Sequence, residues 1–127
     1  MSGNDRRARL IAKFRTITAE RLTTLIEGFE RLESRPHETE TCDLVKRELH
    51  TIKGEAKMLR FESAGRVAHC IEELLIEALE HKRFPAVREF LTEGLDLIGE
   101  LVSVEAPETP ELVSRVDAYC TSNRAKP

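Results

Sequence analysis

The sequence predicts an all-α protein, and three observations support this fold class. Apolar residues recur at spacings of three and four along most of the 127 residues, which is the period of an amphipathic helix. Glycine (6) and proline (5) are sparse, and runs of the β-branched or aromatic residues that strands favour are few. Short connections between the helical segments favour antiparallel neighbours. We therefore expect an antiparallel up-down four-helix bundle, with a shorter fifth C-terminal helix packed on one end.

Each of the first three helices is predicted by its own apolar stripe. The first covers about residues 5–34 and ends before Pro36. The second covers about residues 39–60, and its stripe alternates almost without a break. The third covers about residues 63–82. The stripes of the second and third helices consist of Cys42, Val45, Leu49, Ile52, Ala56 and Leu59, and of Ala64, Val67, Ala68, Ile71, Leu74, Leu75 and Ala78.

The last two helices begin with proline signals. Pro85 suits the first turn of a fourth helix over about residues 85–104. Thr109 and Pro110 then offer an N-cap and a first-turn proline for a fifth helix over about residues 110–122. Residues 123–127 are expected to form a frayed tail. Because no linker, repeat or low-complexity segment interrupts the chain, we expect residues 1–127 to form a single domain.

Composition excludes several classes of function. The net charge is −3 with both signs interspersed, so bulk charge gives no reason to expect nucleic-acid binding. No apolar run approaches the roughly 20 residues that span a bilayer, and the polar N-terminus lacks the apolar core of a signal peptide. The three cysteines are far apart, without a C-x-x-C pair, and fall near apolar stripes, which predicts buried thiols in a reducing compartment. We therefore expect a cytoplasmic protein that does not insert into membranes.

The most informative residue is His50, in the middle of the second predicted helix. Helical geometry advances about 100° per residue, which places His50 about a quarter-turn from the core stripe and so at its rim. Lys53 and Gly54 follow one turn later on the same side. A glycine inside a helix costs roughly 0.5–1 kcal/mol relative to alanine, which suggests that something approaches the helix closely at Gly54.

A half-exposed histidine of this kind suits phosphoryl transfer. One ring nitrogen must be an exposed nucleophile, the other should be held by an acceptor, and a cation such as Lys53 should offset the added negative charge. The third helix offers a carboxylate, Glu72, with His69 one turn earlier and further out. His50 lies about eleven positions before the expected turn and Glu72 about eleven after it, so an antiparallel pair brings them to matching heights.

These residues carry a family resemblance. Residues 50–56 (HTIKGEA), followed by residues 58–61 (MLRF), resemble the phosphorylation-site motif of histidine-containing phosphotransfer domains. The similarity is greatest to the N-terminal phosphotransfer domain of CheA-type chemotaxis histidine kinases. That subgroup combines the motif with a His-x-x-Glu pair in the next helix, represented here by His69 and Glu72. The resemblance covers essentially the whole chain, because the family also has a four-helix bundle with a fifth helix.

The resemblance implies a role for each site residue. His50 is the phosphoryl acceptor, and Glu72 hydrogen-bonds one of its ring nitrogens. Lys53 stabilises the phosphoryl group or the hydrogen-bonded cluster, His69 completes that cluster, and Gly54 leaves room for the partner. Members of the family do not catalyse their own phosphorylation and need no cofactor.

The same resemblance implies two partners. An ATP-binding histidine kinase domain supplies the phosphoryl group, and an aspartate of a response-regulator receiver domain takes it. No glycine-rich phosphate loop occurs in the sequence, in agreement with that division of labour. The chain could be free-standing, but the pair formed by His69 and Glu72 favours a domain of a larger histidine protein kinase.

The sequence departs from the family pattern at two positions. Arg60 stands where the family usually has a glycine, whose left-handed conformation suits the turn that closes the second helix. Glu55 stands where a small residue is usual, but it points away from His50 on the helical wheel. We expect Arg60, together with Lys46 and Lys57, to belong to a partner-binding surface.

Three other functions fit parts of the pattern. A helical adaptor would bind signalling partners through a bundle face without any phosphotransfer. A zinc site could be built from His50, His69 and Glu72, but Lys53 would oppose a cation, so we expect no metal. The dimerisation helix of a sensor kinase is disfavoured, because such helices place a proline shortly after the histidine and none occurs between His50 and Pro85.

Overall fold

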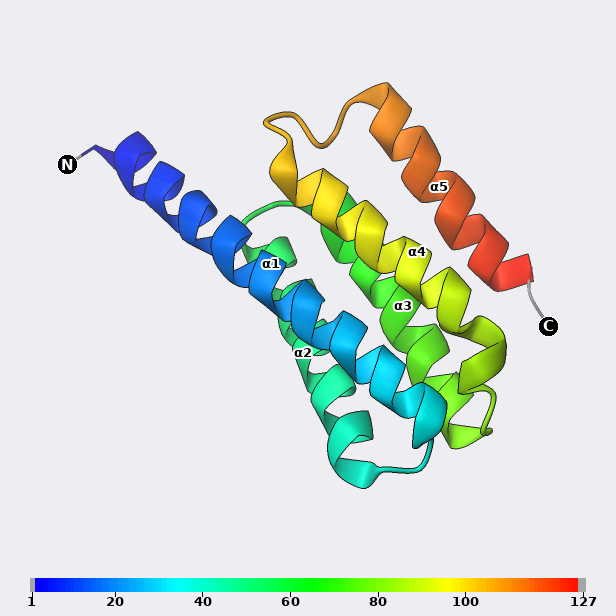
Figure 1. The fold of residues 1–127 in the computed structure, drawn as a ribbon. Coiled ribbons are helices and arrows are strands. Elements are labelled where there is room, and N and C mark those ends of the chain that lie inside the picture. The colour runs from blue at the N-terminus through cyan, green and yellow to red at the C-terminus, as the bar shows by residue number, and fades with distance from the viewer. Residues whose placement is uncertain (1, 126–127) are drawn as a thin grey trace.

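The computed structural model describes residues 2–125, with side chains through residue 122, and in that part of the chain it contains five helices and no strand (Figure 1). The helices are α1 (Gly3–Ser34), α2 (Thr39–Met58), α3 (Glu62–Glu80), α4 (Phe84–Ser103) and α5 (Pro110–Ala125). Helix α1 packs on α2, α2 packs on α3, and α3 packs on α4. Helix α4 also packs on α1, which closes the bundle. The predicted all-α bundle is therefore confirmed.

The fifth helix lies along the side of the bundle, not on one end as expected. It packs mainly on α3 and also touches α4, beside which it runs in Figure 1. Tyr119 anchors it, because its hydroxyl donates to the carbonyl of Phe90 (2.8 Å) and its ring stacks on the Phe90 ring at 4.3 Å. Gly94 makes the space, since a Cβ there would lie 2.3 Å from the hydroxyl oxygen of Tyr119. The apolar face of α5 is therefore covered lengthwise.

Three helices end two or more residues away from the sequence-based bounds. Helix α2 ends at Met58 and α3 at Glu80, each two residues early, because the chain leaves the helical conformation at Arg60 (φ 64°) and Lys82 (φ 58°). Helix α5 continues to Ala125, so the expected frayed tail is wrong for residues 123–125. No glycine or proline follows Pro110 before residue 127, and nothing local stops the helix there. Residues 126–127 of the expected tail lie outside the described residues.

The turn between α2 and α3 is a Schellman motif in which an arginine occupies the glycine position. The backbone N–H of Phe61 donates to the carbonyl of Ala56 (2.8 Å), and that of Arg60 donates to the carbonyl of Lys57 (3.2 Å). Phe61 is buried, with its ring 5.1 Å from that of Phe14. Arg60 therefore adopts the turn geometry that the family pattern assigns to glycine, at an energetic cost.

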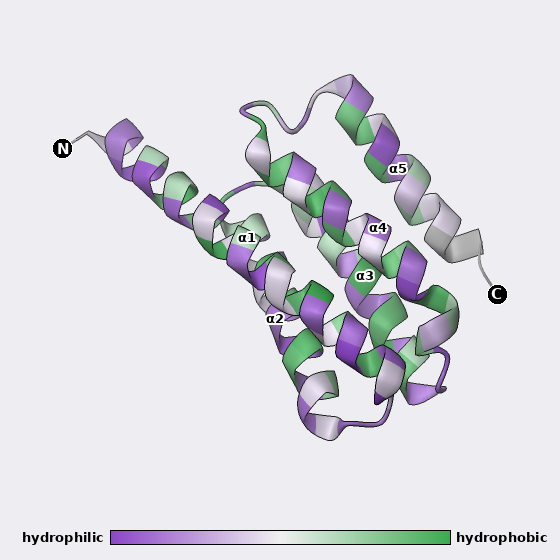
Figure 2. Cartoon of the chain, viewed as in Figure 1, coloured by the Kyte–Doolittle hydropathy of each residue, from purple (hydrophilic) through white to green (hydrophobic). Residues whose placement is uncertain are grey.

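The core sets the rotation of each helix. Hydrophobic and hydrophilic residues alternate around the helices (Figure 2). On α2, Leu49 and Ile52 are fully buried, which leaves the neighbouring positions 50 and 53 at the edge of the bundle. The largest fully buried side chains are Phe29, Phe84, Leu25, Leu32, Leu49, Ile52, Ile71, Leu75, Leu91, Leu95, Ile98 and Leu101.

None of the helices in residues 2–125 combines the length and apolar character needed to cross a membrane.

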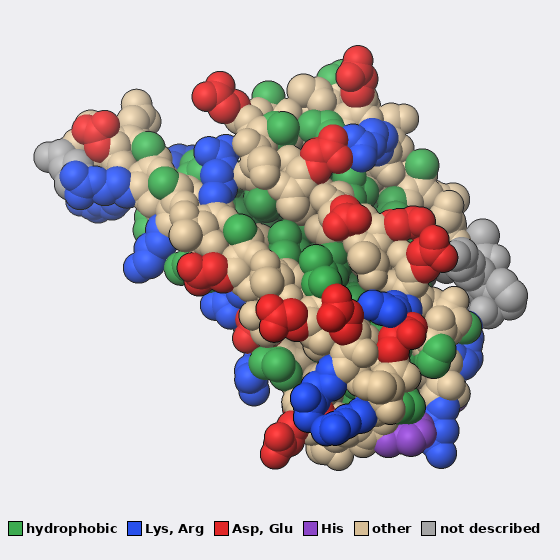
Figure 3. Space-filling model, viewed as in Figure 1, with side chains coloured by type: hydrophobic (Ala, Val, Ile, Leu, Met, Phe, Trp, Pro, Cys, Tyr) green, Lys and Arg blue, Asp and Glu red, His purple; other side chains and the backbone are tan. Residues whose placement is uncertain are grey.

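Charged side chains of both signs cover the face shown in Figure 3, with an excess of one sign in two places. Helix α1 extends beyond the bundle at its N-terminal end, where basic side chains gather, while acidic side chains lie over α4 (Figure 3). This view shows the face of α1 and α4.

Replacing Arg60 with glycine should stabilise the protein. The left-handed conformation costs a side-chain-bearing residue about 1 kcal/mol, and glycine adopts it freely. We expect Arg60→Gly to raise the free energy of unfolding by about 1 kcal/mol, as measured by urea denaturation. Lys82→Gly, at the matching turn after α3, should have the same sign. Destabilisation by both substitutions would contradict this account of the turns.

Candidate functional site

Helices α2 and α3 bring His50 and Glu72 together across their interface. The two helices are antiparallel and joined by a turn of three residues, so positions equally far from the turn lie side by side. The Nδ1 atom of His50 lies 2.8 Å from Oε2 of Glu72. This is the register that loop symmetry predicts. The structure therefore forms a two-helix site from residues 22 positions apart.

The two side chains differ sharply in exposure. The side chain of His50 is 69% exposed, whereas that of Glu72 is 11% exposed. Glu72 follows the fully buried Ile71 on α3, which holds its carboxylate at the edge of the core. The arrangement therefore fixes one side of an imidazole ring to a nearly buried acceptor and leaves most of the ring to solvent.

Lys53 completes the cluster. Its ammonium group donates to Oε1 of Glu72, the carboxylate oxygen that His50 does not contact, and its side chain is 18% exposed. Burial alone raises the pKa of Glu72, but the hydrogen bonds from Lys53 and His50 and the attraction of their charges together outweigh burial and hold that pKa below its usual value. Glu72 is therefore a carboxylate at neutral pH.

The ionised carboxylate determines which nitrogen of His50 carries the proton. A carboxylate can only accept hydrogen bonds, so Nδ1 of the neutral ring must donate to it. The other nitrogen, Nε2, then carries the lone pair, and no described residue forms a hydrogen bond to it. An exposed Nε2 with its lone pair free is a nucleophile.

The structure does not bring His69 into this cluster. Its Nε2 atom lies 2.9 Å from Oε1 of Glu73, one turn further along the same helix. Among the described residues, no hydrogen bond joins His69 to His50, Lys53 or Glu72. Sequence reasoning missed Glu73, although a carboxylate four residues after a histidine is the spacing of a helical ion pair.

Gly54 is exposed and is not required by the packing of this chain. A Cβ added at Gly54 would meet no atom within 4 Å, in contrast to Gly94 under Tyr119. The helix therefore carries a glycine, with its energetic cost, at a position where alanine would fit in the isolated chain.

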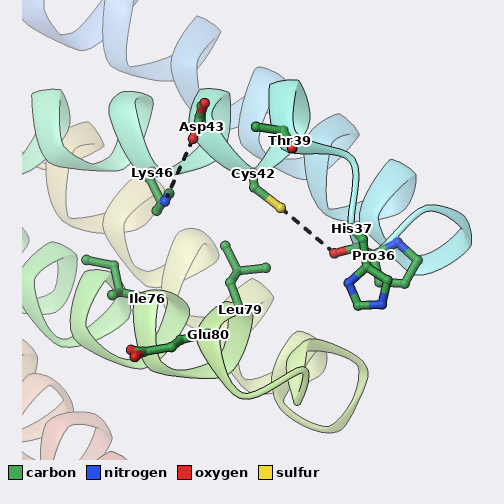
Figure 4. Close-up of a pocket in the computed structure, with 9 residues that line it drawn as sticks. All are labelled: Pro36, His37, Thr39, Cys42, Asp43, Lys46, Ile76, Leu79 and Glu80. Atoms are coloured by element: carbon green, nitrogen blue, oxygen red, sulfur yellow. Dashed lines mark hydrogen bonds and ion pairs between the residues drawn. The ribbon is translucent and has the colours of Figure 1, made fainter.

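The three predicted surface cations lie on the same side of α2 or at its end. Lys46 forms a loose ion pair with Asp43 (3.8 Å) and lines a groove that faces Ile76 of α3 (Figure 4). Lys57 is exposed, and Arg60 occupies the turn. The sequence did not predict the groove, because it forms only where α2 and the α1–α2 loop meet α3.

Comparisons with known proteins give a consistent result. The family model described as "Hpt domain" matches residues 9–119. A gliding motility regulatory protein of Myxococcus xanthus is 37% identical over 93 residues, which is 72% of this chain and 12% of that protein. The chemotaxis protein CheA of Halobacterium salinarum is 40% identical over 58 residues, which is 46% of this chain and 9% of that protein. The chain thus spans a small part of either relative, and no solved structure matches it.

Removing the charge of Glu72 should move the proton on His50. In Glu72→Gln the side-chain amide can donate to Nδ1, so we expect the neutral ring to hold its proton mainly on Nε2. Imidazole 15N NMR at neutral pH measures this change. The free energy of unfolding should also fall by about 1–3 kcal/mol, because Lys53 loses its counter-charge. Glu73→Gln, which alters the partner of His69, should leave the His50 ring unchanged, and an unchanged ring in Glu72→Gln would contradict the assignment.

Proposed function

Because this chain belongs to the Hpt domain family, we propose that His50 is the residue that accepts a phosphoryl group and passes it on. Hpt domains perform histidine phosphotransfer in two-component signalling, relaying phosphate between kinases and receiver domains. The observation that carries the proposal is the hydrogen bond between Nδ1 of His50 and Glu72. It leaves the lone pair on Nε2, in a side chain that is 69% exposed.

The chemistry of acceptance follows from that arrangement. The lone pair of Nε2 attacks the γ-phosphorus of ATP held by a kinase domain, and a nitrogen–phosphorus bond forms. The bond between phosphorus and the bridging oxygen breaks, and ADP leaves with that electron pair. The ring gains positive charge while Nδ1 keeps its proton, and the carboxylate of Glu72 stabilises that charge across a 2.8 Å hydrogen bond.

Donation reverses the electron flow at the same atom. A carboxylate oxygen of an aspartate on a receiver domain attacks the phosphorus, the nitrogen–phosphorus bond breaks, and its electron pair returns to Nε2. Both steps need two large partners to reach one nitrogen in turn. The 69% exposure of the His50 side chain meets that need, and a buried histidine would not.

We assign the supporting residues by their contacts. Lys53 donates to Glu72 and keeps this carboxylate ionised and oriented. We therefore assign Lys53 to the hydrogen-bonded cluster and not to direct contact with the phosphoryl group. Gly54 keeps the helix surface low beside His50, so that a partner can approach. His69 is paired with Glu73 and, among the described residues, forms no hydrogen bond with this cluster, so we assign it no direct role.

The proposed partners are an ATP-binding histidine kinase domain and a response-regulator receiver domain. Lys46, Lys57 and Arg60 would form the partner-binding surface, because both partners present negative charge, as nucleotide phosphates or as acceptor carboxylates. We propose that residues 1–127 act as one Hpt domain. This domain either works as a separate chain with a CheA-type histidine kinase or forms part of such a kinase. ATP is used inside cells, so a cytoplasmic location fits this role.

The geometry disfavours a metal site. The ammonium group of Lys53 already occupies one oxygen of Glu72, where it would repel a bound cation. His69 is held by Glu73 instead of facing His50. The adaptor function and phosphotransfer can be distinguished by experiment. Phosphotransfer needs a histidine at position 50, whereas an adaptor does not.

Substitution of His50 should abolish phosphoryl acceptance. We expect wild-type protein incubated with a CheA-type kinase domain and labelled ATP to gain label that is labile in acid and stable in base. His50→Gln should gain none, since no nucleophilic nitrogen remains at that position, and His69→Gln should still be labelled. Label that persists in His50→Gln would sink the proposal, and normal signalling by an unlabelled His50→Gln protein would favour the adaptor.

Replacing Gly54 with alanine should separate stability from function. The helix should gain about 0.5–1 kcal/mol of unfolding free energy, because alanine is the better helix former and no neighbour blocks its Cβ. Phosphorylation by the kinase domain should slow on the order of tenfold, because the added methyl group displaces the partner. Gly99→Ala on α4, where the added Cβ makes an ordinary 3.5 Å contact with Leu22, should leave the rate unchanged. Equal rates for Gly54→Ala and wild type would show that nothing approaches the helix there.

A further inference from the structure

Phosphorylation of His50 would add negative charge that the cluster formed by Glu72 and Lys53 does not neutralise. A phosphoryl group brings about two negative charges to the surface of α2. The ammonium group of Lys53, the cation nearest in the motif, is bonded to Glu72 and mostly buried. Releasing it would leave the carboxylate of Glu72 nearly buried without that cation. A counter-charge supplied by this chain would therefore have to come from another residue.

Lys57 is an exposed cation on the same face. It lies seven residues after His50, which is two helical turns or about 10 Å along the axis, at nearly the same angle around α2. Among the described residues, no carboxylate forms an ion pair with it. Its charge is therefore available, in contrast to that of Lys53.

The stem of Lys57 is positioned by α3. A Cβ added at Gly65 would lie 3.1 Å from Cγ of Lys57, so the first part of the lysine side chain rests in the space that this glycine leaves. The remaining carbons and the ammonium group extend beyond that contact. Helical side chains lean toward the N-terminus of their helix, which directs Lys57 back toward the turn that carries Gly54, one turn short of His50.

Gly54 leaves that path open. It lies between His50 and Lys57 on the helix surface, and a side chain at this position would stand between the two. The structure has no atom within 4 Å of the place where a Cβ of Gly54 would lie.

We infer that Lys57 is the residue that neutralises the phosphoryl group on His50, reaching across Gly54, while Lys53 serves Glu72. This inference rests on the proposed function and gives Lys57 a second role in it, besides its place in the partner-binding surface. Two other cations lie one turn before His50. Lys46 points toward Asp43 in the groove of Figure 4. Arg47 lies on the side of α2 away from Glu72 and, like Lys46, leans away from His50.

An equilibrium competition tests the inference without depending on how the kinase docks. Equal amounts of wild-type chain and 15N-labelled Lys57→Gln are mixed with a catalytic amount of CheA-type kinase domain, limiting ATP and excess ADP. At equilibrium the phosphoryl group partitions by the relative stability of the two phosphohistidines, which intact-protein mass spectrometry measures. An exposed ion pair predicts that the wild-type chain holds about two to five times more phosphoryl group than the variant.

The matched variants identify the source of that difference. Lys57→Arg, which keeps the charge, should restore a ratio near one, whereas Lys46→Gln and Arg47→Gln should show no loss. Salt at about 1 M should erase the preference, because the screening length is then about 3 Å. These residues are on the surface, so the variants should remain folded, as circular dichroism can verify.

Two results would overturn the inference in distinguishable ways. A ratio of one for Lys57→Gln, with His50 phosphorylated normally, would overturn the role of Lys57 and leave the proposed function intact. Equal losses in Lys46→Gln or Arg47→Gln would do the same, because they would show a diffuse charge effect. Failure of the wild-type chain to take any phosphoryl group at His50 would overturn the proposed function and this inference with it.

Discussion

One carboxylate organises the site. Glu72 accepts a hydrogen bond from Nδ1 of His50 on one oxygen and from Lys53 on the other, across the interface between α2 and α3. Its ionisation fixes the tautomer of His50 and leaves Nε2 as the nucleophile. Its burial makes that geometry rigid, because a charged group at the edge of the core must keep its partners. The atom that we propose as the nucleophile is therefore prepared by a residue that solvent hardly reaches.

The bundle supplies what this carboxylate needs. Leu49 and Ile52 are fully buried and set the rotation of α2, while Ile71 does so for α3 beside Glu72. The turn between the helices fixes their register, with Phe61 buried against Phe14 and Arg60 held in a left-handed conformation. A shift of one residue in that turn would move Glu72 about 100° around α3 or off the height of His50.

The surroundings of His50 suggest a division of labour among the basic residues of α2. Lys53 is committed to Glu72, whereas Lys57 and Lys46 remain near the surface on either side of the histidine. Gly54 fits this arrangement, because a glycine leaves room for a lysine side chain or for a partner. The packing of the chain does not itself require a glycine at this position. This arrangement fits the proposed function, in which His50 carries a phosphoryl group only part of the time.

Sequence alone determined the features that depend on neighbours along the chain. The apolar stripes, the helix order, the position of His50 at the rim and the motif around Lys53 and Gly54 all follow from helical periodicity, and the symmetry of a short turn even placed Glu72 opposite His50. Only the tertiary structure decided which partners the side chains choose. It joined Lys53 to Glu72 and His69 to Glu73, and it laid α5 along α3 where Gly94 admits Tyr119. Periodicity is local and can be counted, whereas the choice of partners depends on distances between helices that only their packing sets.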